Sequence, residues 1–178
     1  MKKILIAVLL QIIALSAVYP QLREGDNILG PSIGLYTTPG TPTFGVNFEN
    51  QITSLGDVAV LGLGGVLRYT SWKDNYPYAD YNNYNYLTLG VQANFNFNNI
   101  GEGKFVPFAG AVLGYNNVNN SYVSNRGVVY TSSYTSGLWL WGQAGFRYFF
   151  SRNFAGGVRI GAGNFNFNAL ELLFDFKL

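Results

Sequence analysis

The sequence contains neither histidine nor cysteine among its 178 residues. Without histidine the chain lacks a common general base and a common transition-metal ligand. Without cysteine it lacks thiol nucleophiles, disulfides and the lipid attachment site of bacterial lipoproteins. Catalytic triads that depend on histidine are also excluded. We therefore expect no catalytic residue, no metal site and no cofactor.

Charged residues are also scarce in this sequence. Charged residues make up 11% of the chain, against about 25% in an ordinary soluble domain, whereas 48% of the residues are hydrophobic. The formal net charge is +2, and Lys2 and Lys3 at the extreme N-terminus account for it. The neutral remainder lacks the clustered basic surface that nucleic acids require, so we expect no nucleic-acid partner.

The first 17 residues have the layout of a secretory signal peptide. The basic start Met1–Lys3 precedes the apolar run Ile4–Ala14, and small residues follow. The run ends near Val18, short of the roughly 20 apolar residues that span a bilayer. We therefore predict a cleaved signal peptide at residues 1–17, a periplasmic lead-in at 18–27 and a single β-barrel domain at 28–178.

From Ile28 onwards the apolar residues recur at every second position and show no helical period. The alternation occupies eight stretches, each about as long as the 9 to 11 residues that a tilted strand needs to cross a bilayer, or longer. The stretches are Ile28–Thr37, Thr43–Ile52, Val58–Thr70, Tyr84–Phe97, Phe105–Asn116, Gly137–Phe150, Phe154–Gly163 and Phe167–Leu178. Short connections, such as 98–104, alternate with long ones at 71–83 and 117–136. This layout predicts an all-β fold, an eight-stranded antiparallel up-and-down transmembrane β-barrel with both termini periplasmic.

The two faces of these stretches differ in polarity. In the last stretch the apolar face holds Leu170, Leu172, Phe174, Phe176 and Leu178. Its opposite face holds Glu171, Asp175 and Lys177. A membrane barrel turns its apolar face to lipid, whereas a soluble lipocalin-like barrel turns it inward. The small residue Ala59 falls on the apolar face, and Phe108 and Val112 fall on the nominal lumen face. A soluble ligand-carrying barrel is the alternative, which solubility without detergent would reveal.

A leader, eight alternating strands and an aromatic-rich last strand together resemble the small outer-membrane β-barrels of Gram-negative cell envelopes, the OmpA/OmpX-like and opacity-type porin family. The resemblance spans the mature chain. The segment Leu170–Leu178 resembles the terminal strand that the outer-membrane assembly machinery recognises, with Phe174, Phe176 and Leu178 as its signal. That strand usually ends in phenylalanine, and here Leu178 ends it. The resemblance implies an outer-membrane location and contact with membrane lipid and lipopolysaccharide. We expect the protein to be a monomer.

Polar and charged residues on the predicted lumen face form the first candidate site. They are Glu49, Arg68, Gln92, Gln143, Arg147, Arg159, Glu171 and Asp175. A three-residue turn at 164–166 would set Arg159 directly opposite Glu171. Because the interior of an eight-stranded barrel is only wide enough for side chains, we predict that this network plugs the lumen. The alternative is a gated ion path, which stable currents across a planar bilayer would reveal.

Aromatic residues near the outer strand ends, together with Trp72 in the loop at 71–83, form the second candidate site. They are Tyr36, Trp72, Tyr84, Tyr86, Trp139 and Trp141. We interpret them first as aromatics that pack together where the strands extend beyond the membrane, or that line the membrane interface. The alternative is an outer surface that binds sugars, lipid A or a host protein. The loop at 117–136 either moves freely or extends the strands outward through Val128–Tyr130.

The function predicted from these features is structural or surface-interacting, as in adhesion or ligand binding, with the extracellular loops as the active part and no catalysis. A narrow channel or porin-like protein for small solutes is the alternative. A lipid-modifying enzyme of the outer membrane is disfavoured, because such enzymes use a histidine that this chain lacks.

Overall fold

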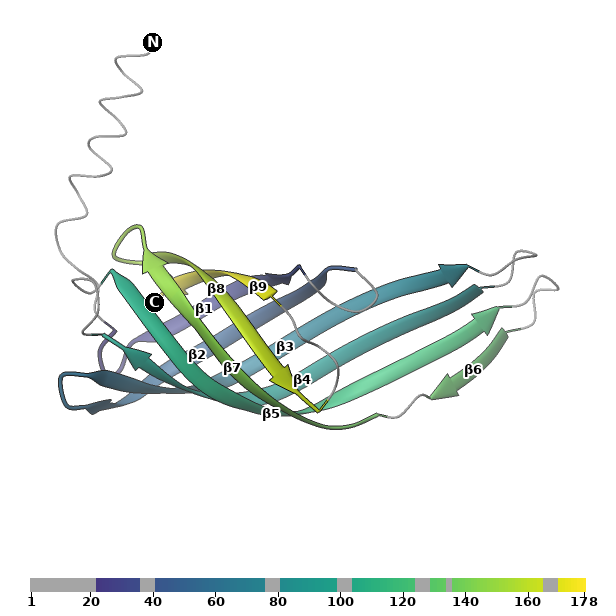
Figure 1. Ribbon diagram of the computed structural model, residues 1–178, viewed down its shortest axis with the longest axis horizontal. Coiled ribbons are helices and arrows are strands. Elements are labelled where there is room, and N and C mark those ends of the chain that lie inside the picture. The colour runs from purple at the N-terminus through teal and green to yellow at the C-terminus, as the bar shows by residue number, and fades with distance from the viewer. Residues whose placement is uncertain are drawn as a thin grey trace, which may run out of the picture.

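The computed structural model describes residues 22–35, 41–75, 81–98, 104–123, 129–133, 136–164 and 170–178. Within these ranges the chain forms nine β-strands (Figure 1). They are β1 (Asn27–Gly34), β2 (Thr43–Leu55), β3 (Ala59–Asn75), β4 (Tyr81–Phe97), β5 (Phe105–Val123), β6 (Val129–Ser133), β7 (Gly137–Phe149), β8 (Phe154–Gly163) and β9 (Leu170–Lys177). The described part of the chain holds no helix long and apolar enough to cross a membrane.

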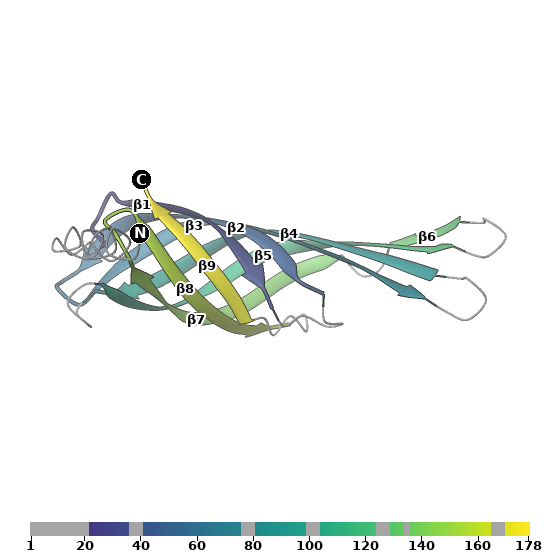
Figure 2. The ribbon, with the colours of Figure 1, turned by 90° about the horizontal axis from the view of Figure 1, so that it is seen from above.

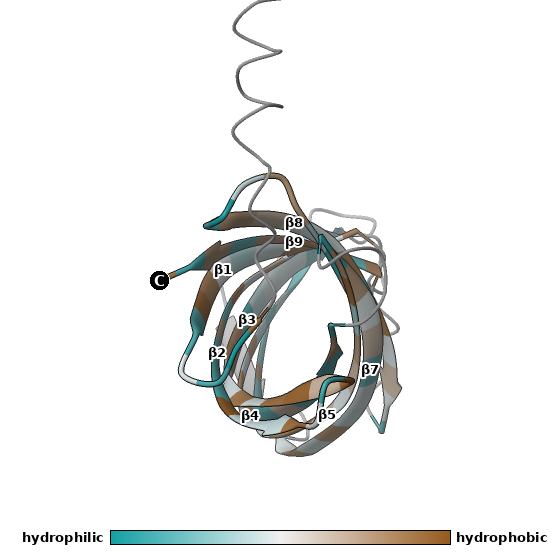
Figure 3. Cartoon of the chain, turned by 90° about the vertical axis from the view of Figure 1, so that its left-hand side faces the viewer, coloured by the Kyte–Doolittle hydropathy of each residue, from teal (hydrophilic) through white to brown (hydrophobic). Residues whose placement is uncertain are grey.

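The strands form one antiparallel sheet that closes on itself. The hydrogen-bonded order runs from β4 through β3, β2, β1, β9, β8 and β7 to β5, and the pairing of β4 with β5 completes the ring. The view along the barrel shows this ring (Figure 3). Because β6 and β7 pair with the same edge of β5, they share one position. The predicted eight-stranded up-and-down barrel is therefore confirmed.

The junction between β6 and β7 is a one-residue shift in register. Asn119 lies opposite Ser133 in the ladder with β6, whereas Asn116 lies opposite Gly137 in the ladder with β7. Between the two ladders, the Ser136 hydroxyl accepts a hydrogen bond from the Val118 main-chain N–H at 3.1 Å. Of the two interpretations of the 117–136 segment, the structure therefore supports strand extension. Val128 itself lies outside the described residues.

The outer face of the barrel is an apolar belt. Its exposed side chains include Leu29, Phe44, Val46, Phe48, Leu63, Leu67, Leu89, Val91, Phe95, Leu113, Leu138, Leu140, Phe146, Ile160, Phe174 and Phe176. A soluble protein rarely exposes so large an apolar surface, but lipid solvates it in a membrane barrel. Ala59 departs from the prediction, because this small side chain lies between Leu55 and Phe97 in the register and is buried.

Strands β3, β4 and β5 continue well past the ends of their neighbours, and the short strand β6 pairs with the extension of β5. Together they form a sheet that projects from one end of the barrel and comprises residues 70–75, 81–86, 117–123 and 129–133 (Figure 2). We call this projection the arm. Six residues of extended chain reach about 20 Å. The predicted long loops at 71–83 and 117–136 are therefore largely β-structure, since the cross-strand hydrogen bonds persist beyond the barrel.

The opposite end of the barrel holds the start and the end of the described chain. Leu22 is buried against Ile28, Val106, Phe149 and Ala155 in an apolar cluster. The main-chain N–H of Leu178 donates to the carbonyl oxygen of Asn27 at 2.9 Å, which ties the C-terminus to β1. The lead-in predicted at 18–27 thus contributes a side chain, Leu22, to the barrel interior.

Candidate functional site

Arg147 is the centre of an ion group near the terminus end of the lumen. Its Nε donates to Asp175 Oδ2 at 2.7 Å, and its Nη2 donates to Glu49 Oε2 at 2.8 Å. Its Nη1 donates to Asn96 Oδ1 at 2.5 Å, and its guanidinium carbon lies 4.4 Å from the centre of the Phe108 ring. We call Arg147, Glu49 and Asp175 the terminus-side ions. They come from β7, β2 and β9, which only barrel closure brings together.

Amide side chains donate hydrogen bonds to both oxygens of Glu49. Glu49 accepts hydrogen bonds from Asn94 at 2.8 Å, Asn96 at 2.6 Å and Gln51 at 3.0 Å. Gln143 in turn donates to Asn94 at 2.7 Å and to Gln92 at 3.2 Å. A buried carboxylate with this many donors keeps its charge at little cost, because its lost hydration is replaced.

Glu171 is the centre of a second ion group nearer the arm. Arg159 lies directly opposite Glu171 in the register between β8 and β9, the pairing that the sequence predicted, and forms an ion pair with it. The Nε of Arg68 lies 2.7 Å from the other carboxylate oxygen of Glu171. Arg159 also donates to Asn47 Oδ1 at 2.9 Å. We call Arg68, Arg159 and Glu171 the arm-side ions.

Two tryptophans hold the guanidinium of Arg68. The rings of Trp139 and Trp141 stack at 5.4 Å, and the guanidinium carbon of Arg68 lies 4.7 Å and 4.2 Å from their centres. Both tryptophans are almost fully buried, with exposed fractions of 2% and 1%. An arginine over a desolvated tryptophan face gains about 2 kcal/mol. The tryptophans thus fix the arm-side ions in place.

The described lumen contains equal numbers of positively and negatively charged side chains. The described ion pairs of the lumen join three arginines to three carboxylates, and all six side chains are buried. Such groups are tolerated in a low-dielectric interior only when paired and hydrogen-bonded. Among the described residues, no cluster of acidic side chains is arranged to hold a metal ion.

Gly161 on β8 makes the space in which Trp141 lies. A Cβ atom at Gly161 would clash with two atoms of the Trp141 ring and would lie 2.6 Å from the carbonyl oxygen of Gly142. We expect Gly161→Ala to displace that ring and to lower the free energy of unfolding by about 1–3 kcal/mol, as overpacking does. Urea unfolding of the refolded barrel measures this change. The control is Gly142→Ala, where the added Cβ meets only a carbonyl oxygen at 3.9 Å.

The six predicted aromatic residues do not form one surface. Trp139 and Trp141 are buried in the lumen, whereas Trp72 lies on the arm and stacks on Tyr84 and Tyr86 at 4.8 Å and 4.9 Å. The three arm residues, which we call the arm aromatics, are partly exposed. Tyr36 lies outside the described residues. The sequence placed five of the six on one strand parity and Trp72 in the loop at 71–83, but it could not reveal where the barrel ends and the arm begins.

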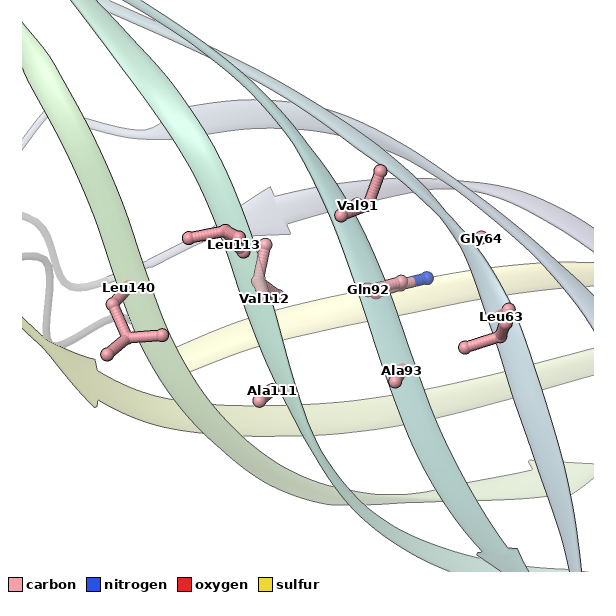
Figure 4. Close-up of a pocket in the computed structure, with 9 residues that line it drawn as sticks. All are labelled: Leu63, Gly64, Val91, Gln92, Ala93, Ala111, Val112, Leu113 and Leu140. Atoms are coloured by element: carbon pink, nitrogen blue, oxygen red, sulfur yellow. The ribbon is translucent and has the colours of Figure 1, made fainter.

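A shallow groove of about 400 Å³ lies on the outer wall rather than in the lumen (Figure 4). Ala93 and Ala111 lie opposite each other across β4 and β5, and larger side chains surround them. The surrounding residues are Leu63, Val91, Leu113 and Leu140. Because these side chains belong to the apolar belt, the groove faces the lipid and offers no polar chemistry.

Several members of the lumen network were missing from the predicted site. Asn94 and Asn96 lie on the predicted lumen parity but had no assigned role, and Gln51 and Phe108 were not assigned either. The contacts of Asn94 and Asn96 with Glu49 join β4 to β2, which are not neighbours, and alternation along one strand does not reveal them. Gln51 lies two residues from Glu49 on β2, and Phe108 contacts Arg147 between the neighbouring strands β5 and β7. The excess of asparagine and glutamine on the lumen parity was a usable signal.

The sequence matches no protein-family model and no curated protein. Solved structures do match the fold. Ail, the attachment invasion locus protein of Yersinia pestis, solved with the heparin analogue sucrose octasulfate, gives a TM-score of 0.54 at 13% identity, covering 87% of this chain and 97% of Ail. The N-terminal β-barrel domain of Pseudomonas aeruginosa OprF gives a TM-score of 0.57 at 14% identity, and the match covers 87% of this chain and 98% of the OprF domain. The fold is that of the small outer-membrane β-barrels.

A third small outer-membrane β-barrel, Neisserial surface protein A, gives a TM-score of 0.50 at 14% identity and covers 86% of this chain and 94% of its own. The predicted resemblance is therefore confirmed for the fold. At these identities the likeness concerns the architecture alone. The function must be argued from the residues of this chain.

Proposed function

We propose that this chain is an outer-membrane protein whose arm projects from the cell surface and binds an external ligand. The arm is the observation that carries the proposal. It projects from the end of the barrel opposite Asn27 and Leu178 (Figure 1). With both termini in the periplasm, as alternating loop lengths predict, the arm stands outside the cell. The solved small outer-membrane barrels of like fold support this location.

The composition of the arm and its tips suits a binding surface. Residues 71–86 contain five tyrosines, four asparagines and one tryptophan. Tyrosine and tryptophan provide large rigid contact areas at low entropic cost, and asparagine provides adaptable hydrogen bonds. The arm aromatics are held against one another by stacking, so little ordering is required when a ligand binds.

The sequence of the arm and of the segments that connect its strands favours an uncharged ligand, such as a neutral glycan or an uncharged protein surface. Residues 70–88 and 117–136 hold two basic residues, Lys73 and Arg126, and two acidic residues, Asp74 and Asp80. A polyanion requires an excess of cationic groups. The sulfated ligand seen with Ail therefore does not carry over to this chain.

The lumen, in this proposal, is a closed structural plug. The paired ions and their amides fill the interior of the barrel and stabilise it, with no catalytic role. The protein acts as a monomer in contact with lipopolysaccharide and membrane lipid, after secretion through the signal peptide and insertion by the assembly machinery.

We expect Trp72→Ala to weaken ligand binding about 30-fold, because truncating an aromatic anchor costs about 2 kcal/mol or more. Whole host cells and immobilised neutral oligosaccharides serve as ligands, and heat-modifiable migration on gels reports the folded barrel. Tyr148→Ala, at the other end of the barrel, is the matched aromatic control and should bind normally. Unchanged binding by a folded Trp72→Ala protein would contradict the proposed site.

A further inference from the structure

The arm-side ions and the terminus-side ions carry opposite net charges. Arg68 and Arg159 against Glu171 sum to +1, whereas Arg147 against Glu49 and Asp175 sums to −1. On β9 the buried side chain of Leu173 lies between Glu171 and Asp175. The carboxylates of one group make no ion pair with the arginines of the other among the described residues. The arm side of the lumen therefore carries a positive charge that Glu171 balances only in part.

Unpartnered hydrogen-bond donors gather at the same place. The Nη1 of Arg68, the Nε1 atoms of Trp139 and Trp141, and the Nδ2 of Asn47 are buried and have no hydrogen-bond partner in the protein. All four atoms are N–H donors. Arg68 lies over both tryptophan rings, and Asn47 contacts Arg159, so these donors belong to Arg68 itself or to residues in contact with the arm-side ions.

A positive charge and unpartnered N–H groups together select an anion. Water would satisfy the donors but would leave the charge unbalanced, and a cation would meet both repulsion and inward-facing protons. The exposed fractions of Arg68, Trp139 and Trp141 are 6%, 2% and 1%, so a bound anion must give up its hydration, which costs a singly charged halide less than a multiply charged oxyanion. We propose that the arm-side ions bind a small halide-type anion through Arg68 and the indole N–H groups.

Tryptophan fluorescence tests this site directly, because the chain has three tryptophans and two of them would touch the anion. Trp72→Phe leaves only Trp139 and Trp141 as reporters. We expect refolding in iodide to quench this variant along a saturable curve, and chloride at constant ionic strength to reverse the quenching. Caesium, a cationic quencher, should have no effect. The proposal would be overturned if iodide and caesium quenched the fluorescence equally and without saturation. It would also be overturned if iodide caused no quenching.

Two further variants in the Trp72→Phe background identify the binding groups. Arg68→Gln removes the positive charge and should abolish saturable quenching, whereas Arg152→Gln, on an exposed turn, should leave it unchanged. Because Arg68→Gln could prevent folding, Trp139→Phe provides the second test: it keeps the ring and removes one N–H. We expect its half-saturating iodide concentration to rise at least about tenfold, as loss of a hydrogen bond to a charged group requires. An unchanged value in Trp139→Phe overturns the proposal.

Discussion

Replacing Arg147 by methionine is expected to destabilise the barrel by about 3–5 kcal/mol, the cost of breaking a buried ion pair from one side. The side chain contacts Glu49, Asp175 and Asn96, so its loss leaves two carboxylates buried without a cation. Methionine keeps an unbranched side chain as far as the position of Nε and lacks the guanidinium, so the charge is lost together with its hydrogen bonds. Urea unfolding of the protein refolded into lipid vesicles, followed by gel migration, measures the change.

Two comparisons define the origin of that loss. Arg152→Met removes an arginine from an exposed turn and should shift the free energy of unfolding by no more than about 0.5 kcal/mol. Removing all three charges with Arg147→Met, Glu49→Gln and Asp175→Asn should recover most of the stability, because no uncompensated charge then stays buried. Equal urea midpoints for Arg147→Met and Arg152→Met would show that the terminus-side ions do not stabilise the fold.

Deleting residues 176–178 is expected to abolish barrel assembly altogether. Phe176 pairs with Leu29 of β1 and Phe154 of β8, and its ring lies 5.2 Å from that of Phe154. Lys177 forms an ion pair with Asp26 at 2.6 Å, and Leu178 hydrogen-bonds to Asn27. The deletion therefore opens the seam between the first and last strands, and it also removes the segment predicted to be the assembly signal.

Refolding in detergent and insertion in cells separate these two roles. A truncated protein that refolds in detergent but is not inserted in cells has lost recognition by the assembly machinery. A truncated protein that neither refolds in detergent nor inserts in cells has lost the ability to close the barrel. Lys177→Met is the control, since it removes the Asp26 ion pair and keeps the strand. Normal insertion of the truncated chain in cells would contradict both roles.

The strand pattern and the two faces of the barrel could be predicted because they depend on local sequence. A strand alternates its side chains with period two, so the polarity of Glu171 and Phe174 is sufficient to orient β9. The short predicted turn at 164–166 was likewise enough to pair Arg159 with Glu171 across β8 and β9. Contacts between adjacent strands follow from one register and one turn.

Contacts across the lumen could not be predicted in the same way. Arg147 on β7 meets Glu49 on β2, and Arg68 on β3 lies over Trp139 on β7. Their distance depends on how the whole sheet tilts and closes, which no single strand encodes. The same closure separated Trp139 and Trp141 from the arm aromatics, although all share one parity.

The sequence by itself determined the class of this protein: scarce charge, absent histidine and cysteine, and eight alternating stretches allow an apolar belt outside and polar groups inside. Only the tertiary structure decided how the lumen charges divide into two groups of opposite sign and how far the strands project beyond the barrel. The physical reason is that alternation is a property of each strand, whereas charge balance across the lumen and the extent of the arm depend on the mutual register of all the strands.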